Sequence, residues 1–159
     1  DAWAHRPGDD PKDRNFKEPE VNEANMEEAR QRTRFAGGRA RLLRSLSVPA
    51  AGYFEDGSLD WLYIDALHTY EATLANLEAW YPKVRWGGLV SGDDYGDAEE
   101  TPMLPTSRYE WGIGSYYPRY FNWGVIRATN HFARRKGHQL FVSWLLDCYQ
   151  TPAWYFMKA

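Results

Sequence analysis

Two short apolar segments near the middle of the chain predict strands, and aspartates lie at their ends. Residues 59–65 read LDWLYID, and after Asp60 they stay apolar on both faces until they end at Asp65. Residues 88–92 read GLVSG and are followed directly by Asp93 and Asp94. A strand that is apolar on both faces is typical of the centre of a parallel sheet with both sides covered. We expect this environment for residues 59–65.

Four segments have the spacing or the end signals of helices. Leu74, Leu77 and Trp80 recur on one face of a predicted helix. We expect this helix to begin at Tyr70, with Thr69 as its N-cap. The other predicted helices are residues 23–34 with Asn22 as the N-cap, residues 48–54 with Ser47 as the N-cap, and residues 124–136, which Gly137 ends.

Three further segments predict the remaining strands. Residues 40–44 are expected to form a short strand, and residues 139–146 and 152–158 are rich in aromatic and apolar side chains. The turn between the last two is short, which favours an antiparallel hairpin. Because strands and helices alternate, the chain predicts an α/β fold with a mostly parallel sheet and an antiparallel strand in its C-terminal hairpin.

The length and composition favour one domain with its own core. The chain has 159 residues, 43% of them hydrophobic, which is too apolar for a disordered protein. We expect residues 1–159 to form a single, partial domain. Residues 4–20 and 96–121 each carry several prolines and predict loops, the second on the substrate side of the sheet.

Charge and cysteine content narrow the possible classes of function. The formal net charge of −3 is weak support against a nucleic-acid-binding protein. The longest apolar runs are shorter than the roughly 18 residues that a membrane helix needs. A single cysteine, Cys148, excludes an intrachain disulfide and a multi-cysteine metal site. The polar N-terminal residues lack the apolar region of a signal peptide, so we expect a cytoplasmic protein.

The aspartates at the strand ends are the first candidates for chemistry. Ligands of open α/β sheets bind beyond the carboxyl ends of the strands, where Asp65, Asp93 and Asp94 converge if their strands are neighbours. Three close carboxylates repel one another and need a cation, and ligation by oxygen alone favours Mg²⁺, Ca²⁺ or Mn²⁺ over zinc. The alternative is that these acids are helix caps or solvated loop residues.

Two further residues belong to the same predicted edge of the sheet. His68 follows Asp65 by three residues, and an imidazole beside carboxylates can act as a general base near neutral pH. Alternatively, it only hydrogen-bonds the loop. Asp1 could end another strand and bind ribose hydroxyls. No glycine-rich phosphate loop and no GxSxG nucleophile motif is present.

Three motifs within residues 59–95 together resemble a known family. They are Ile64-Asp65-Ala66 with His68 and Tyr70, Trp80 with Pro82 and Gly87-Gly88, and Asp93-Asp94-Tyr95. In this combination the chain resembles class I S-adenosylmethionine-dependent methyltransferases. The similar subgroup is related to the macrocin-type sugar O-methyltransferases and, more distantly, to the catechol O-methyltransferases. The likeness extends over about residues 1–158.

The resemblance implies a role for each candidate residue. The residues implied to bind S-adenosylmethionine are Asp1 at the ribose, Trp3 at the adenosine, Ser47 on the adenine side and Asp65 near the methionine end. Those implied to hold Mg²⁺, or another divalent cation, are Asp65, Asp93 and Asp94. His68 corresponds to the general base of the catechol enzymes.

The implied function is O-methyl transfer to a hydroxylated small molecule or a sugar. Family members begin with a strand and a glycine-rich loop that binds the cofactor's methionine part, and residues 1–159 resemble only the later part of the domain. The alternative is therefore a degenerate, non-catalytic subunit that serves as a scaffold in a larger assembly. The expected partners are a small-molecule acceptor and either a second copy or a chain that supplies the missing N-terminal part, with neither nucleic acid nor membrane.

Overall fold

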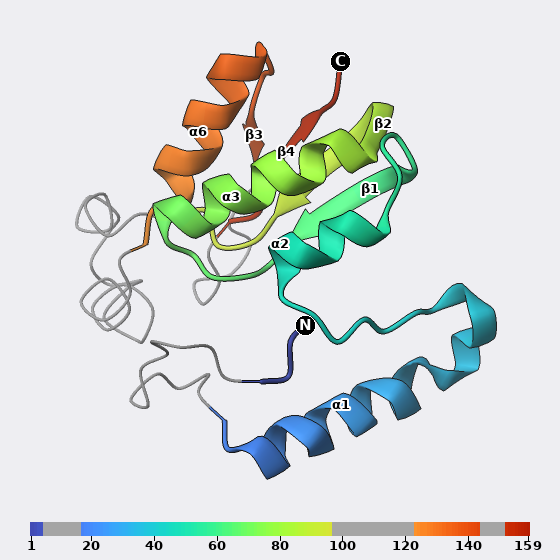
Figure 1. Cartoon of the computed structure of the whole chain (residues 1–159). Helices are drawn as coiled ribbons and strands as arrows, with labels where there is room; N and C mark the ends of the chain where they lie inside the picture. Colours follow the sequence, from blue (N-terminus) through green and yellow to red (C-terminus); the bar gives the residue numbers. More distant parts are fainter. Residues whose placement is uncertain (5–16, 97–122, 144–151) are drawn as a thin grey trace. The chain divides into compact units, whose positions relative to one another are not determined.

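A computed structural model describes residues 1–4, 17–96, 123–143 and 152–159 (Figure 1). Its contacts divide the chain into two compact units, Asp1–Ala50 and Ala51–Ala159. The predicted loops at 4–20 and 96–121 fall largely outside the described residues. No helix in the described part is long and apolar enough to cross a membrane.

The first unit contains helix α1 (Pro19–Thr33), the 3-10 turn η1 (Arg34–Arg39) and the short helix α2 (Ser47–Ala50). The predicted start of α1 is wrong: Glu18 takes the N-cap position, and Asn22 lies inside the helix. Pro19 explains the difference, since proline at the first helical position has the required φ and lacks only an N–H that would be unpaired there. The described part of this unit contains no strand at residues 40–44, so that prediction is also wrong.

The second unit is built on a four-stranded sheet in the order β1-β2-β4-β3. Its strands are β1 (Leu59–Ile64), β2 (Val84–Gly92), β3 (Phe141–Val142) and β4 (Trp154–Met157). Strands β1 and β2 are parallel, and β4 is antiparallel to both of its neighbours, β2 and β3. The predicted α/β fold, with its antiparallel C-terminal strand, is confirmed. Strand β2 begins four residues before the predicted start.

The helices predicted for residues 70–80 and 124–136 are found close to their expected positions, and the one predicted for 48–54 is divided between α2 and a turn. Turn η2 (Ala51–Tyr53) continues α2, helix α3 (Tyr70–Trp80) leads into turn η3 (Tyr81–Lys83), and helix α6 covers Val125–Lys136. The Thr69 side chain accepts a hydrogen bond from the Ala72 amide at 3.2 Å, which confirms the predicted cap of α3. Gly137, with φ 75°, ends α6 in the left-handed conformation that favours glycine.

The core lies between one face of the sheet and the helices α3 and α6 (Figure 1). Its buried members are Leu62, Ile64, Val84, Val90, Trp154 and Phe156 from the strands and Leu77, Val125 and Phe132 from the helices. This face carries the alternate residues of β4, because successive strand side chains point to opposite sides.

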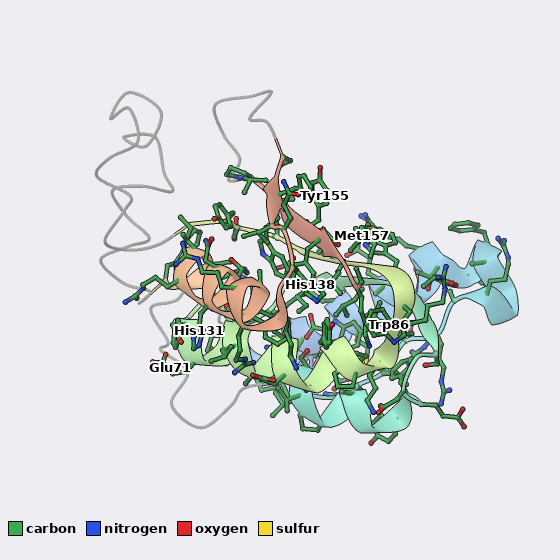
Figure 2. The ribbon with its side chains drawn as sticks, turned by 90° about the horizontal axis from the view of Figure 1, so that it is seen from above. Glu71, Trp86, His131, His138, Tyr155 and Met157 are labelled. Carbon is green, nitrogen blue, oxygen red and sulfur yellow. The ribbon has the colours of Figure 1, made fainter. Side chains whose placement is uncertain are left out.

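The opposite face of the sheet is exposed among the described residues. Trp61 and Tyr63 of β1 are 61% and 47% exposed, and Tyr155 and Met157 of β4 also face outward (Figure 2). The expectation that β1 is covered on both faces is therefore wrong for the part of the chain that the structure describes. The uncovered aromatic side chains explain why residues 59–65 lack polar alternation although one face is open.

Gly92, the last residue of β2, provides a test of this packing. A Cβ at Gly92 would lie 2.4 Å from Cζ2 of the buried Trp154 and 2.6 Å from the Ile64 carbonyl oxygen. Because backbone and a core indole cannot easily yield, we expect Gly92→Ala to lower the free energy of unfolding by about 1–3 kcal/mol in urea titrations. Gly52→Ala is the control, since a Cβ there meets nothing within 4 Å. Equal stability of the two variants would contradict the packing.

Candidate active site

The paired strands β1 and β2 bring the predicted aspartates to one edge of the sheet. Ile64 lies opposite Gly92 in the parallel register, and the Asp93 amide donates to the Ile64 carbonyl at 3.0 Å. Asp65, Asp93 and Asp94 therefore leave the sheet side by side. Asp94 has a φ of 51°, which is uncommon for a residue other than glycine. Such backbone conformations concentrate at functional sites.

His68 lies between two of these carboxylates. Its Nε2 atom is 3.6 Å from Oδ1 of Asp65 and 3.5 Å from Oδ2 of Asp94. Both distances are too long for well-formed hydrogen bonds, so this buried nitrogen has no close hydrogen-bond partner among the described residues. The histidine side chain is 22% exposed and that of Asp65 61%, so the pair is reached from solvent on the Asp65 side.

The loop that carries His68 is held by the residues just before α6. Trp123 forms an isolated antiparallel bridge with Thr69, and the Gly124 amide donates to the His68 carbonyl at 2.9 Å. The Trp123 ring, which is buried, lies 5.3 Å from the imidazole ring. Gly124 has to be glycine here, because a Cβ would lie 2.6–2.8 Å from atoms of Tyr70.

The start of α6 also holds the segment that follows Asp94. The Val125 amide donates to the Gly96 carbonyl at 3.2 Å, and Nδ2 of Asn130 donates to the Tyr95 hydroxyl at 2.7 Å. Helix α6 therefore fixes both sides of the acid–histidine cluster. Trp123 and Asn130 were not among the residues singled out from the sequence, because their contacts join segments that are far apart in the chain.

The charges around His68 shift its protonation. Burial by itself would lower the pKa of His68, but the contact with Asp65 and the negative charges of Asp94 and Asp65 outweigh it, so the pKa is raised above its usual value. The same contact with His68 lowers the pKa of Asp65. The two carboxylates therefore make the neutral imidazole more basic and stabilise the imidazolium that forms when it accepts a proton.

Asp93 has a different partner. Burial, the charge of Asp93 and its hydrogen bond raise the pKa of Tyr63 to about 12. The Tyr63 hydroxyl therefore stays protonated at neutral pH beside the Asp93 carboxylate. Tyr63 was not predicted as a site residue, since nothing in its local sequence distinguishes it from a packed strand tyrosine.

The three aspartates do not form the expected metal centre in this arrangement. Asp65 and Asp94 face His68, while Asp93 is engaged by Tyr63. No group of three His, Cys, Asp or Glu side chains within the described ranges has the geometry to hold a metal ion. The residues therefore do not fit Mg²⁺ as they are placed here, because a cation that relies on protein oxygens needs several of them at one point.

The other predicted cofactor residues lie in the first unit. The Ser45 amide donates to the Asp1 carbonyl at 3.1 Å, and Nη2 of Arg44 donates to the Trp3 carbonyl at 3.1 Å. The N-terminal residues therefore run beside the segment that leads into α2 at Ser47. The Asp1 carboxylate is exposed and accepts a hydrogen bond from the Trp3 amide at 2.9 Å. Their binding role stays a prediction.

Comparisons with known proteins agree with this fold and site. The family described as a methyltransferase domain matches residues 2–95, which is more than half of the chain. The chain therefore belongs to this methyltransferase-domain family. The match ends just after Asp93 and Asp94 and thus contains both strand ends of the site. No curated protein sequence matches the chain.

Solved structures show the same fold at low sequence identity. A Staphylococcus aureus protein whose name assigns it provisionally to the caffeoyl-CoA O-methyltransferases has a TM-score of 0.60 and 15% identity, over 88% of this chain and 61% of that one. The methyltransferase PaMTH1 of Podospora anserina, solved with S-adenosylhomocysteine, has a TM-score of 0.55 and 14% identity, over 87% and 57%. A Corynebacterium glutamicum protein has a TM-score of 0.54 and 13% identity, over 88% and 57%.

The chain thus spans about three fifths of the length of these structures. At such identities the likeness establishes an α/β methyltransferase fold, consistent with a partial domain.

The raised pKa of His68 predicts how its contribution to stability changes with pH. A folded-state pKa above the unfolded value gives stabilisation that is complete below about pH 6.5 and is lost as the pH rises through the folded-state pKa. We expect His68→Gln to cost more unfolding free energy at about pH 5.5 than at about pH 8. Urea unfolding in the presence of a chelator measures this difference.

His138 is the matched control, with the opposite sign. Burial and the charges of Lys136 and Lys158 lower the pKa of His138, so its neutral form is favoured in the folded state. Below about pH 6.5 this histidine therefore destabilises the fold. We expect His138→Gln to gain stability relative to the wild type as the pH falls. The same pH trend for both variants would contradict the assigned environments.

Proposed function

We propose that this chain forms part of an S-adenosylmethionine-dependent O-methyltransferase that acts on a hydroxyl group of a small molecule or sugar. The observation that carries the proposal is the His68 imidazole between Asp65 and Asp94, at the carboxyl ends of two parallel strands. Membership of the methyltransferase-domain family and the fold of the three structural neighbours support the same class.

The chain's own residues supply the acid–base part of such a reaction. His68 takes the proton of the acceptor hydroxyl at Nε2, and the carboxylates of Asp65 and Asp94 stabilise the imidazolium that forms. When it is bound, S-adenosylmethionine provides an electrophilic methyl group on sulfur. The acceptor oxygen forms the new C–O bond as the C–S bond breaks, and the proton remains on His68.

The choice of oxygen as the acceptor rests on three observations. The candidate base, His68, has carboxylate neighbours, and an imidazole can accept a proton from a hydroxyl group near neutral pH. The Asp93-Asp94-Tyr95 motif is one of the three that resemble a subgroup related to the sugar O-methyltransferases. The name of the S. aureus neighbour also refers to O-methylation.

A divalent cation is not part of this proposal. The sequence resemblance implies Mg²⁺ at Asp65, Asp93 and Asp94, but among the described residues these side chains do not converge on one point that could hold a metal ion. We derive no step through a metal. Calorimetry of Mg²⁺ binding to the full-length protein, compared with Asp93→Ala plus Asp94→Ala, tests this point. Binding that the double variant abolishes would show that Asp93 leaves Tyr63 to join a metal centre.

The proposal predicts a loss of turnover when His68 is removed. Loss of a general base typically costs about 10²–10⁴ in rate, so His68→Ala in the full-length enzyme should lower turnover by this factor. Affinity for S-adenosylmethionine should change little, since His68 is assigned to the acceptor proton. Release of S-adenosylhomocysteine with a panel of catechol and sugar acceptors measures turnover, and calorimetry measures affinity.

His131→Ala is the control for this experiment. His131 contacts Tyr70 through Nδ1 at 2.5 Å and is exposed on α6, so its removal should leave turnover near the wild-type value. If His68→Ala keeps near-wild-type turnover, His68 is not the general base and has only a structural role. Failure of the wild-type protein to bind S-adenosylmethionine would reject the methyltransferase activity itself.

A further inference from the structure

Helix α1 carries a stripe of charged residues that changes sign halfway along it. The stripe consists of Glu20, Glu23, Glu27, Arg30 and Arg34, spaced alternately by three and four residues. At about 100° per residue, this spacing places all five on one face of the helix and its continuation at the C-cap. The N-terminal half of the stripe is therefore acidic and the C-terminal half basic.

This helix has little support from burial. None of its residues is buried, and its half-buried positions, Asn22, Met26, Ala29 and Thr33, define a different face. An isolated helix of 15 residues is only marginally stable in water, and most helices in proteins gain stability from packing. The charged stripe thus belongs to a helix that would gain from a partner.

The central residues of the stripe form ion pairs within the chain, whereas the residues at its ends do not do so in the described part. Glu27 pairs with Arg30, and Glu23 pairs with Arg44 at 2.5 Å. No ion pair within the described part of the chain involves Glu20 or Arg34. The unused charges are therefore of opposite sign, and they lie at opposite ends of the helix.

We propose that α1 pairs with α1 of a second copy of this chain, antiparallel, through this stripe. In an antiparallel pair centred near Glu27, Glu20 of each copy faces Arg34 of the other, and Glu23 comes close to Arg30. The two Glu27 side chains meet at the centre, where each is neutralised by Arg30 of its own chain. The two contacts at the ends are equivalent by two-fold symmetry, as in other isologous interfaces. The opposed helix dipoles favour the same orientation over a parallel pair.

The pairing is weak and depends on salt. Exposed ion pairs are worth about 0–1 kcal/mol each, and they are screened as ionic strength rises. We therefore expect reversible association that weakens with salt and is largely lost at about 1 M NaCl, where the Debye length is about 3 Å. Association through the exposed aromatic face of the sheet would instead persist at high salt.

A charge exchange tests the pairing directly in the full-length protein by sedimentation equilibrium at low salt. Glu20→Lys and Arg34→Glu each replace two attractions by two repulsions, so each variant alone should self-associate about tenfold more weakly. Mixing the two variants restores opposite charges at both ends of a heterodimer, and affinity should return. Combining both substitutions in one chain should also restore self-association. Circular dichroism verifies that α1 remains helical.

Glu28→Lys is the matched control, because it changes the net charge equally but lies outside the stripe, where Glu28 pairs with Arg32 at 2.5 Å. This variant should associate like the wild type. A wild-type protein that stays monomeric at low salt overturns the proposal, as do end variants that associate like the control. The proposal is also overturned if mixing Glu20→Lys with Arg34→Glu does not restore association, because two complementary variants recover affinity only when they bind each other.

Discussion

The parallel pairing of β1 with β2 is the contact on which the candidate site depends. It places Ile64 opposite Gly92, and the amide of Asp93 completes it by donating to the Ile64 carbonyl. Two strand ends that are 28 residues apart in the chain thereby deliver their carboxylates to one edge. Gly92 permits the close approach, because the Trp154 indole and the Ile64 carbonyl occupy the space that a side chain would need. The core on one face of the sheet thus sets the geometry of the acids at its edge.

Helix α6 provides the second constraint. Trp123 and Gly124, just before the helix, hold the His68 loop, and Val125 at its start holds the segment after Asp94 through Gly96. The imidazole is consequently fixed between Asp65 and Asp94 by backbone contacts rather than by strong hydrogen bonds of its own. A weakly bonded but well-positioned nitrogen can still exchange a proton with a ligand, which a saturated one cannot do without breaking bonds.

Much of the second unit could be predicted, because its signals are local. The Thr69 cap, the Gly137 end and the apolar strand before Asp65 each depend on a few neighbouring residues. Residues 40–44 show the limit of such signals, since strand propensity has little meaning without a partner strand. Asn22 shows another limit, because a proline three residues earlier determined where the helix begins.

In the candidate site, too, the features set by the local sequence could be predicted, and the contacts between distant segments could not. The sequence predicted that Asp65, Asp93 and Asp94 would meet near His68, because the carboxyl ends of parallel strands share an edge. It did not predict that Tyr63 would engage Asp93 or that Trp123 would pack on His68, since both contacts depend on side-chain directions that only the fold determines. The observed arrangement differs from the expected three-carboxylate centre because His68 lies between Asp65 and Asp94, and Asp93 lies beside Tyr63 instead.

The most direct test is a crystal structure of the full-length protein with S-adenosylhomocysteine. The central claim, that the strand-end cluster is a methyl-transfer site, predicts the cofactor sulfur at the carboxyl end of β1 beside Asp65. It should lie close enough to Nε2 of His68 for one acceptor oxygen to bridge the two. A cofactor bound at another edge of the sheet, or a sulfur separated from His68 by protein atoms, would contradict the account.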